Sequence, residues 1–298
     1  MADASDASTS TWPKVADAWV NILARQAPPV LKRSQDELAK FEENIYDIPV
    51  RVLVDVVESD PMMTLSLMLV IGRFQSSRPT EIEDTHQALM MIGCGNFAKK
   101  SLSLPTIESM LARRPEALLG ALRATARARR AAAFARKFAE LRLDRNEGPA
   151  ALAALLYEIT DLLAWIYAPD KMLQFEEVVR ENPRRKIALT RWMEFGFEWE
   201  DLENKVLKRF KLPEIVRELI KPGEDAPLTA EMVKLAVTFA KQLSNPRDTE
   251  SMRVTLRRIS AFLKVPVSTL ITELKLETTP LADMAKEGDP MHRRGDAA

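Results

Sequence analysis

The sequence is poor in the residues from which disulfides and metal centres are built. It contains one cysteine, Cys94, and two histidines, His86 and His292, in 298 residues. A single cysteine excludes an internal disulfide and is typical of a protein from a reducing cytoplasm. Two histidines are too few for the histidine-based metal centres that activate water in hydrolytic enzymes.

The sequence also lacks an excess of charge of either sign and any long apolar run. Lysine plus arginine equals aspartate plus glutamate at 43 each, which argues against a general attraction to nucleic acid or to anionic membranes. No uninterrupted apolar run reaches the roughly 20 residues of a membrane-spanning helix. The opening MADASDASTST is polar and has no apolar core of a signal peptide. We therefore expect a soluble cytoplasmic protein that contacts neither membrane nor nucleic acid.

The residues that are abundant in this sequence favour helices. Glycine is scarce, with nine residues, and hydrophobic residues make up 46% of the chain, dominated by alanine, leucine and methionine, which are strong helix formers. Asp60-Pro61 is typical of a helix start, and Ser34 begins a capping box. The pattern predicts a long arginine-rich helix over 115–142 and an apolar helix from 148–149 to about 168. The fold class is therefore all-α.

The predicted helices suggest one compact body with polar ends. We expect an N-terminal segment over residues 1–35, with a disordered start and one helix. The helical domain follows over 36–275. Residues 276–298 are polar with proline and glycine, and we expect a disordered C-terminal tail there.

Several segments, in this order, resemble one known family. PVRVLVDVVESDPMMTLSLMLVIGRF precedes TEIEDTHQALMMIGCGNFAKKSLSL, in which residues 88–93 form an alanine–leucine–glycine turn. RARRAAAFARKFAEL and LLYEITDLL follow, and then FEWEDLENKVLKRFKLPEIVRELI with its Leu-Pro turn. Over about residues 36–270 the chain resembles the HDOD (HD-related output domain) family, degenerate relatives of the HD-domain phosphohydrolases. The resemblance implies a compact, multi-helix, HD-domain-like fold from a bacterium.

The same resemblance implies that the metal centre is absent. Tyr157-Glu158 stands where catalytic HD enzymes carry their metal-binding His-Asp pair. Arginines around 127–130 stand where a preceding histidine ligand could sit, and Lys221-Pro222 stands where a histidine pair can occur. We therefore expect a scaffold without catalytic residues, metal or other cofactors.

Two carboxylates remain in the apolar stretch LLYEITDLLAWI, namely Glu158 and Asp161. A buried carboxylate is costly unless a cation or hydrogen-bond donors meet it. Our hypothesis is that one or two arginines of the preceding helix reach these acids. The candidates, at helical spacings, are Arg123, Arg127, Arg130 and Arg136. The alternative is that both acids lie at the helix surface and meet water.

Three functions stay open, and we favour the first. It is a non-catalytic role in signal transduction or regulation, through binding another signalling or regulatory protein, and it allows for a homodimer. The second is a sensor that binds an anionic nucleotide in a vestigial cavity. Its expected lining residues are Arg127, Arg130, Tyr157, Glu158 and Asp161. The third is a divergent phosphohydrolase in which Glu158 and Asp161 hold a hard cation such as Mg²⁺.

Overall fold

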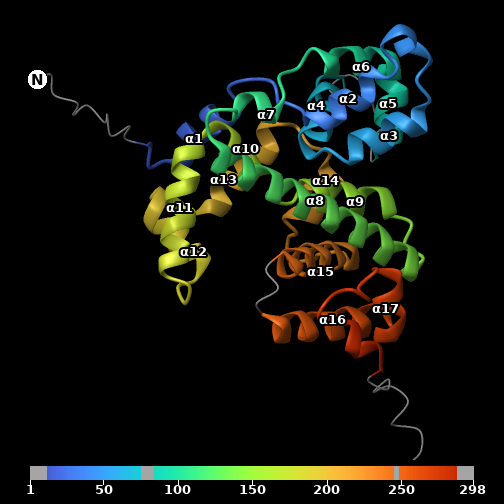
Figure 1. The fold of residues 1–298 in the computed structure, drawn as a ribbon, viewed down its shortest axis with the longest axis vertical. Helices are drawn as coiled ribbons and strands as arrows, with labels where there is room; N and C mark the ends of the chain where they lie inside the picture. Colours follow the sequence, from blue (N-terminus) through green and yellow to red (C-terminus); the bar gives the residue numbers. More distant parts are fainter. Residues whose placement is uncertain (1–11, 75–83, 245–247, 287–298) are drawn as a thin grey trace, which may run out of the picture.

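The structure, a computed structural model, describes residues 12–74, 84–244 and 248–286. These residues form seventeen α-helices and no strand (Figure 1), and their one extended pairing is an isolated bridge between Val30 and Thr106. The all-α fold class predicted from composition is confirmed.

The helices fall into neighbouring groups along one elongated body (Figure 1). The first group holds α2 (Lys32–Ala39), α3 (Val50–Glu58), α4 (Pro61–Phe74), α5 (Thr85–Ile92) and α6 (Cys94–Leu102). The centre holds α8 (Pro115–Arg142), α9 (Glu147–Leu156), α14 (Glu214–Ile220) and α15 (Leu228–Leu243). A side group holds α1 (Ala16–Leu23), α10 (Ile159–Tyr167), α11 (Pro169–Glu181), α12 (Ile187–Phe195) and α13 (Trp199–Arg209). Two short 3-10 segments (Glu42–Asp47 and Ala282–Lys286), α7 (Ile107–Met110), α16 (Thr249–Leu263) and α17 (Val267–Glu273) complete the described chain.

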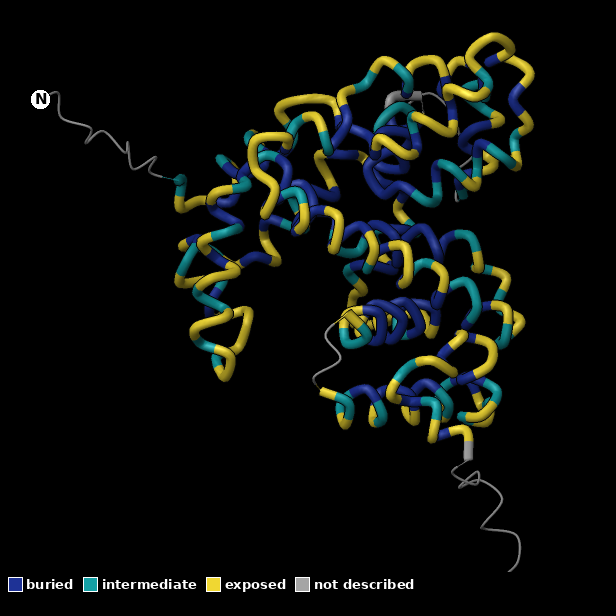
Figure 2. The backbone as a smooth tube through the Cα atoms, viewed as in Figure 1, coloured by how far each residue is buried: buried dark blue, intermediate teal, exposed yellow. Residues whose placement is uncertain are grey.

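The long helix α8 organises the centre, and its bounds match the predicted helix over 115–142. It packs against α9, α10 and α15. Its buried face is largely alanine, which lets neighbouring backbones approach closely. Two phenylalanines fill the wider gaps, and Phe134 contacts Phe239 of α15 with ring centroids 5.4 Å apart. Figure 2 shows the resulting buried band running through the central helices.

The start of α4 is the predicted acid-proline cap, and its carboxylate also binds the backbone at the start of α2. The Oδ1 atom of the fully buried Asp60 accepts hydrogen bonds from the backbone N–H groups of Met62 (3.0 Å) and Met63 (3.1 Å). Its Oδ2 atom accepts one from Leu31 at 2.7 Å. The predicted capping box at Ser34 is wrong, because Ser34 lies inside α2. The free N–H groups at the start of α2 are met instead by Asp60 and by Glu108, two residues remote in sequence.

The apolar helix predicted from 148–149 to 168 is two helices. α9 ends at Leu156 and α10 begins at Ile159, with Glu158 outside helical geometry at φ −102° and ψ 26°. Among the described residues, the segment 147–167 is long and apolar enough to cross a membrane by length and composition. However, 83% of its apolar window is buried inside the protein, as in the core helix of a folded domain.

The ordered chain extends further toward the C-terminus than the division at residue 275 anticipated. Leu276, Leu281 and Met284 are buried, within a segment expected to belong to the disordered tail. Because these apolar side chains are separated by polar residues, the composition of the segment did not predict that they are buried. Residues 287–298 of the expected tail, and most of the expected disordered start, lie outside the described residues.

Candidate functional site

Glu158 lies in the turn between α9 and α10, and two cations meet its carboxylate. The Nε atom of Arg127 on α8 donates to Oε2 at 3.2 Å, and the Nζ atom of Lys241 on α15 donates to Oε1 at 2.9 Å. Burial alone would raise the pKa of Glu158, but Lys241 and Arg127 together hold the pKa below its ordinary value. The hypothesis that an arginine of the preceding helix reaches this carboxylate is confirmed for Arg127.

Asp161 is three residues further on, but it meets a different pair of residues. Nη2 of Arg191 on α12 forms an ion pair with Oδ2, and the indole Nε1 of Trp199 on α13 donates to Oδ1 at 3.0 Å. The Arg191 guanidinium also lies over the rings of Trp199 (4.7 Å) and Phe175 (5.6 Å). The predicted alternative, in which both acids meet water, is wrong: side-chain exposure is 13% for Glu158 and 11% for Asp161.

Tyr157 faces a third set of charges. Burial raises its pKa, which Lys221 opposes and Glu203 reinforces. Lys221 itself is held by two carboxylates, with Nζ 2.5 Å from Oε2 of Glu203 and 3.3 Å from Oε1 of Glu200. Lys221 thus forms an ion-pair cluster with Glu203 and Glu200 that acts on the tyrosine.

The donor set does not fit a metal ion. Within the part of the chain that the structure describes, no three His, Cys, Asp or Glu side chains gather closely enough to hold one. Glu158 and Asp161 already have cationic partners where a metal would have to bind. His86 is exposed on α5, and His292 lies outside the described residues.

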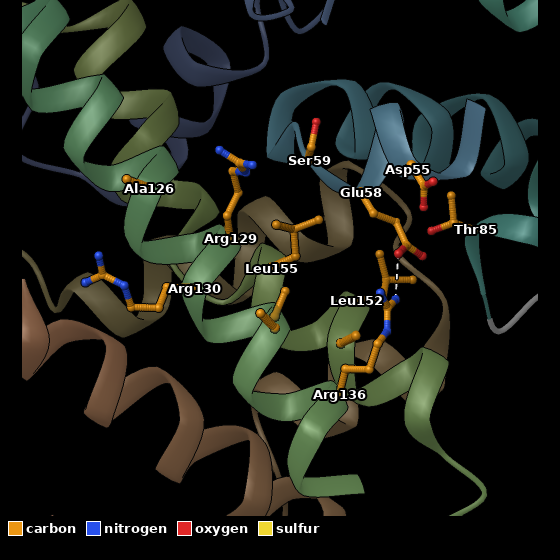
Figure 3. A pocket seen from close by; sticks show the side chains of 13 residues that line it. Asp55, Glu58, Ser59, Thr85, Ala126, Arg129, Arg130, Arg136, Leu152 and Leu155 are labelled. Carbon is orange, nitrogen blue, oxygen red and sulfur yellow. Dashed lines mark hydrogen bonds and ion pairs between the residues drawn. The ribbon is translucent and has the colours of Figure 1, made fainter. Parts of the chain in front are cut away.

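A cavity of about 500 Å³ lies between α3, α5, α8 and α9 (Figure 3), and Glu158 does not line it. Of the five residues expected around a vestigial cavity, Arg130 alone lines it. The Arg130 side chain extends away from the space and donates to Oγ of Ser244 at 3.4 Å. The structure therefore gathers a different set of residues around this cavity.

Sequence reasoning missed most of those residues. Asp55 and Glu58 come from α3, Thr85 from the start of α5, and Arg129 and Arg136 from α8. The sequence feature that could have pointed to this cavity is the run of arginines in α8. That run alone does not show which of its arginines face α3. No sequence motif contains Asp55 or Thr85, and only the tertiary fold brings these residues beside α8.

The comparison with known families identifies the scaffold. The model of the HDOD domain matches residues 28–226, about two thirds of the chain. The chain belongs to the HDOD family. The resemblance expected over about 36–270 is confirmed for the part up to 226, and the helices from α15 onward lie beyond the HDOD match.

Two solved structures share the fold of this chain. The MmoQ response regulator from Methylococcus capsulatus aligns over 80% of this chain and 98% of its own, with a TM-score of 0.61 and 14% identity. A virulence factor from Campylobacter jejuni aligns over 91% of this chain and 98% of its own, with a TM-score of 0.63 and 15% identity. At these identities the likeness concerns the fold. No protein of curated function matches this HDOD chain.

Proposed function

We propose that this HDOD protein is a non-catalytic component of signal transduction that acts by binding another protein. Membership in the family and the regulator among its structural neighbours support a role in signalling. The cationic partners of Glu158 and Asp161 support a role without metal chemistry, because both carboxylates already bind side chains of other helices.

The observation that carries the proposal is an exposed apolar face on α12. Leu189, Trp192 and Met193 are 50%, 51% and 53% exposed. Their spacing of three and four residues puts them on one side of the helix, whereas Thr190 and Phe195 on the opposite side are buried. Half-exposed tryptophan and methionine side chains in one patch are typical of protein-binding surfaces.

The charges beside this face favour one kind of partner. Arg184 and Lys186 are exposed in the loop that joins α11 to α12. This loop forms the tip of the α11–α12 pair, which extends away from the central helices in Figure 1. We therefore expect a protein partner with an apolar patch bordered by acidic side chains, since complementary charges steer association.

Site-specific cross-linking tests the proposal. A photo-reactive p-benzoylphenylalanine at position 192 should capture a partner protein in cells of the native host. The matched control is the same group at Val254 on α16, which is 56% exposed but lies away from α12. A partner captured at position 192 and not at 254 should then bind the purified protein, and Leu189→Ser with Trp192→Ser should weaken that binding.

Two results would contradict the proposal. If position 192 cross-links only to a second copy of this chain, the face is a homodimer interface. If positions 192 and 254 capture the same proteins equally, the α12 face is not a specific binding surface.

A further inference from the structure

The cavity between α3, α5, α8 and α9 has an apolar floor and polar ends (Figure 3). Leu152 and Leu155 of α9 form much of the floor, beside small alanines of α8 that leave space open. A volume of about 500 Å³ falls in the range of small-molecule sites, roughly 300–1,000 Å³. The cavity is therefore large enough for one small organic molecule.

One end of the cavity is positively charged. Arg129 lines it and makes no hydrogen bond or ion pair with any residue in the described ranges. Arg129 remains exposed to solvent; partial burial and the neighbouring charge of Arg33 lower its pKa, and the nearby Asp60 opposes this. Among the described residues Asp60 forms no ion pair with Arg129, and its two oxygens accept three backbone hydrogen bonds. Nη2 of Arg33 donates to the carbonyl oxygen of Ser59, another lining residue, at 2.7 Å.

The other end offers hydrogen-bonding groups that the described protein leaves unused. The Thr85 hydroxyl is buried, with the residue 1% exposed, and has no hydrogen-bond partner. A buried hydroxyl without a partner costs about 1–3 kcal/mol. The side chain of Asp55, which also lines the cavity, makes no ion pair or hydrogen bond with the described residues. By contrast, Glu58 and Arg136 neutralise each other, with Oε2 and Nη2 2.5 Å apart.

We propose that this cavity binds a small phosphate ester with a flat, amino-bearing body, of the size of a nucleoside monophosphate. The phosphate lies at Arg129, where the second guanidinium of Arg33 adds attraction for a dianion. The flat body covers Leu152 and Leu155. Its amino group donates to Asp55 and to the Thr85 hydroxyl. The proposal is independent of the partner-binding role of α12.

Ligand titration tests the proposal on the full chain. AMP, GMP and CMP each carry a phosphate and an amino-bearing base, and at least one should raise the melting temperature at about 1 mM by mass action. Inorganic phosphate and the corresponding nucleoside should each stabilise the protein less than the nucleotide does. If AMP binds, IMP should bind more weakly, because a carbonyl group replaces its amino group.

Variants separate this cavity from general charge attraction. Arg129→Gln should weaken binding, measured by calorimetry, by at least about tenfold, as expected for a lost charge-assisted contact. Arg123→Gln removes an exposed arginine from the same helix outside the cavity and should leave the affinity unchanged. Thr85→Val should weaken binding without lowering the melting temperature of the free protein, since it removes a hydroxyl that lacks a partner.

Three results would overturn the proposal. They are no stabilisation by any of the three nucleotides, equal binding of inorganic phosphate and nucleotide, and equal losses from Arg123→Gln and Arg129→Gln. The cross-linking experiment at α12 needs no nucleotide, so its result tests the partner-binding proposal independently of this one.

Discussion

At the scale of single residues, Asp161 shows how a charge is tolerated inside this protein. Its carboxylate is 11% exposed and is met by the Arg191 guanidinium and the Trp199 indole. Arg191 lies in turn over two aromatic rings, which stabilise a cation by their π-electrons. One buried acid thus connects α10 to both α12 and α13.

Arg191→Met should leave Asp161 charged, buried and without its cation. We expect the free energy of unfolding, measured by urea denaturation, to fall by about 3 kcal/mol, as for a broken buried ion pair. Arg180→Met removes an arginine of an exposed pair on α11 (side-chain exposures 77% and 60%) and should cost less than about 1 kcal/mol. Adding Asp161→Asn to Arg191→Met should restore part of the loss. Equal losses from the two arginine variants would contradict the assignment of a buried pair.

Glu158 should make stability depend on pH. Because its pKa is lower in the folded protein than the ordinary value of 4.5, its charge stabilises the fold above that pH. This contribution is lost as the pH falls through the folded-state pKa. Glu158→Gln should therefore cost about 1–2 kcal/mol at pH 7, a typical loss for charged hydrogen bonds at a partly buried site.

Urea denaturation between pH 7 and pH 3 measures this dependence. The difference between Glu158→Gln and the parent protein should shrink as the pH falls below 4.5. The control is Glu176→Gln, at an exposed position on α11. A difference that stays constant over this range would contradict the role of the charge.

At the scale of the elements, the sequence predicts those helix boundaries that local capping and proline residues determine. The bounds of α8 and the start of α4 follow from a proline at the first turn and from an acid before a proline. The break at Tyr157–Glu158 follows from no local signal. The backbone at Glu158 leaves helical geometry. Its carboxylate binds Arg127 and Lys241, which lie 31 and 83 residues away in the sequence. Such tertiary contacts override helix propensity.

The crossing of α8 and α10 depends on a glycine. A Cβ atom at Gly120 would lie 2.8 Å from the Trp165 ring, which has little room to move in the core. We expect Gly120→Ala to lower the free energy of unfolding by about 1–3 kcal/mol, as for other overpacked cores. Gly223→Ala, where no atom lies within 4 Å of the added Cβ, should be neutral or slightly stabilising. Thermal unfolding of both variants tests this, and equal melting temperatures would contradict the close packing.

At the scale of the whole molecule, the body is larger than its family domain. The HDOD match ends at residue 226, but α15 packs against α8 and α9 and buries Val233, Phe239 and Ala240. Lys241 of the same helix completes the pair at Glu158. The central core is therefore shared between the HDOD domain and the helix that follows it.

A chain that ends at residue 226 should not fold to the native state. Loss of α15 would expose Phe134 and its neighbours on α8, so we expect increased binding of a hydrophobic dye and non-cooperative thermal unfolding. Full-length Phe239→Ala should remain cooperative and lose about 3–5 kcal/mol, as for a large-to-small change in a core. Cooperative unfolding of the shortened chain at the parent melting temperature would contradict the shared core.

The candidate site could be predicted only in part. Arg127 was expected near Glu158 from helical spacing and from family resemblance, and the structure pairs them. Lys241 and Arg191 come from distant parts of the chain, so neither spacing nor motif could supply them. The cavity beside Arg129 depends on four helices packing together, and no pattern in one sequence predicts that packing.

The exposure of Trp192 gives the molecule an intrinsic optical reporter. The protein has five tryptophans, and among them Trp19, Trp165 and Trp199 are buried and Trp12 is partly buried. Trp192 is 51% exposed, so its emission lies at longer wavelength and dissolved iodide quenches it first. Docking of a partner on α12 would shift that emission to shorter wavelength and shield it from the quencher. The binding face can therefore be followed by fluorescence in the unlabelled protein.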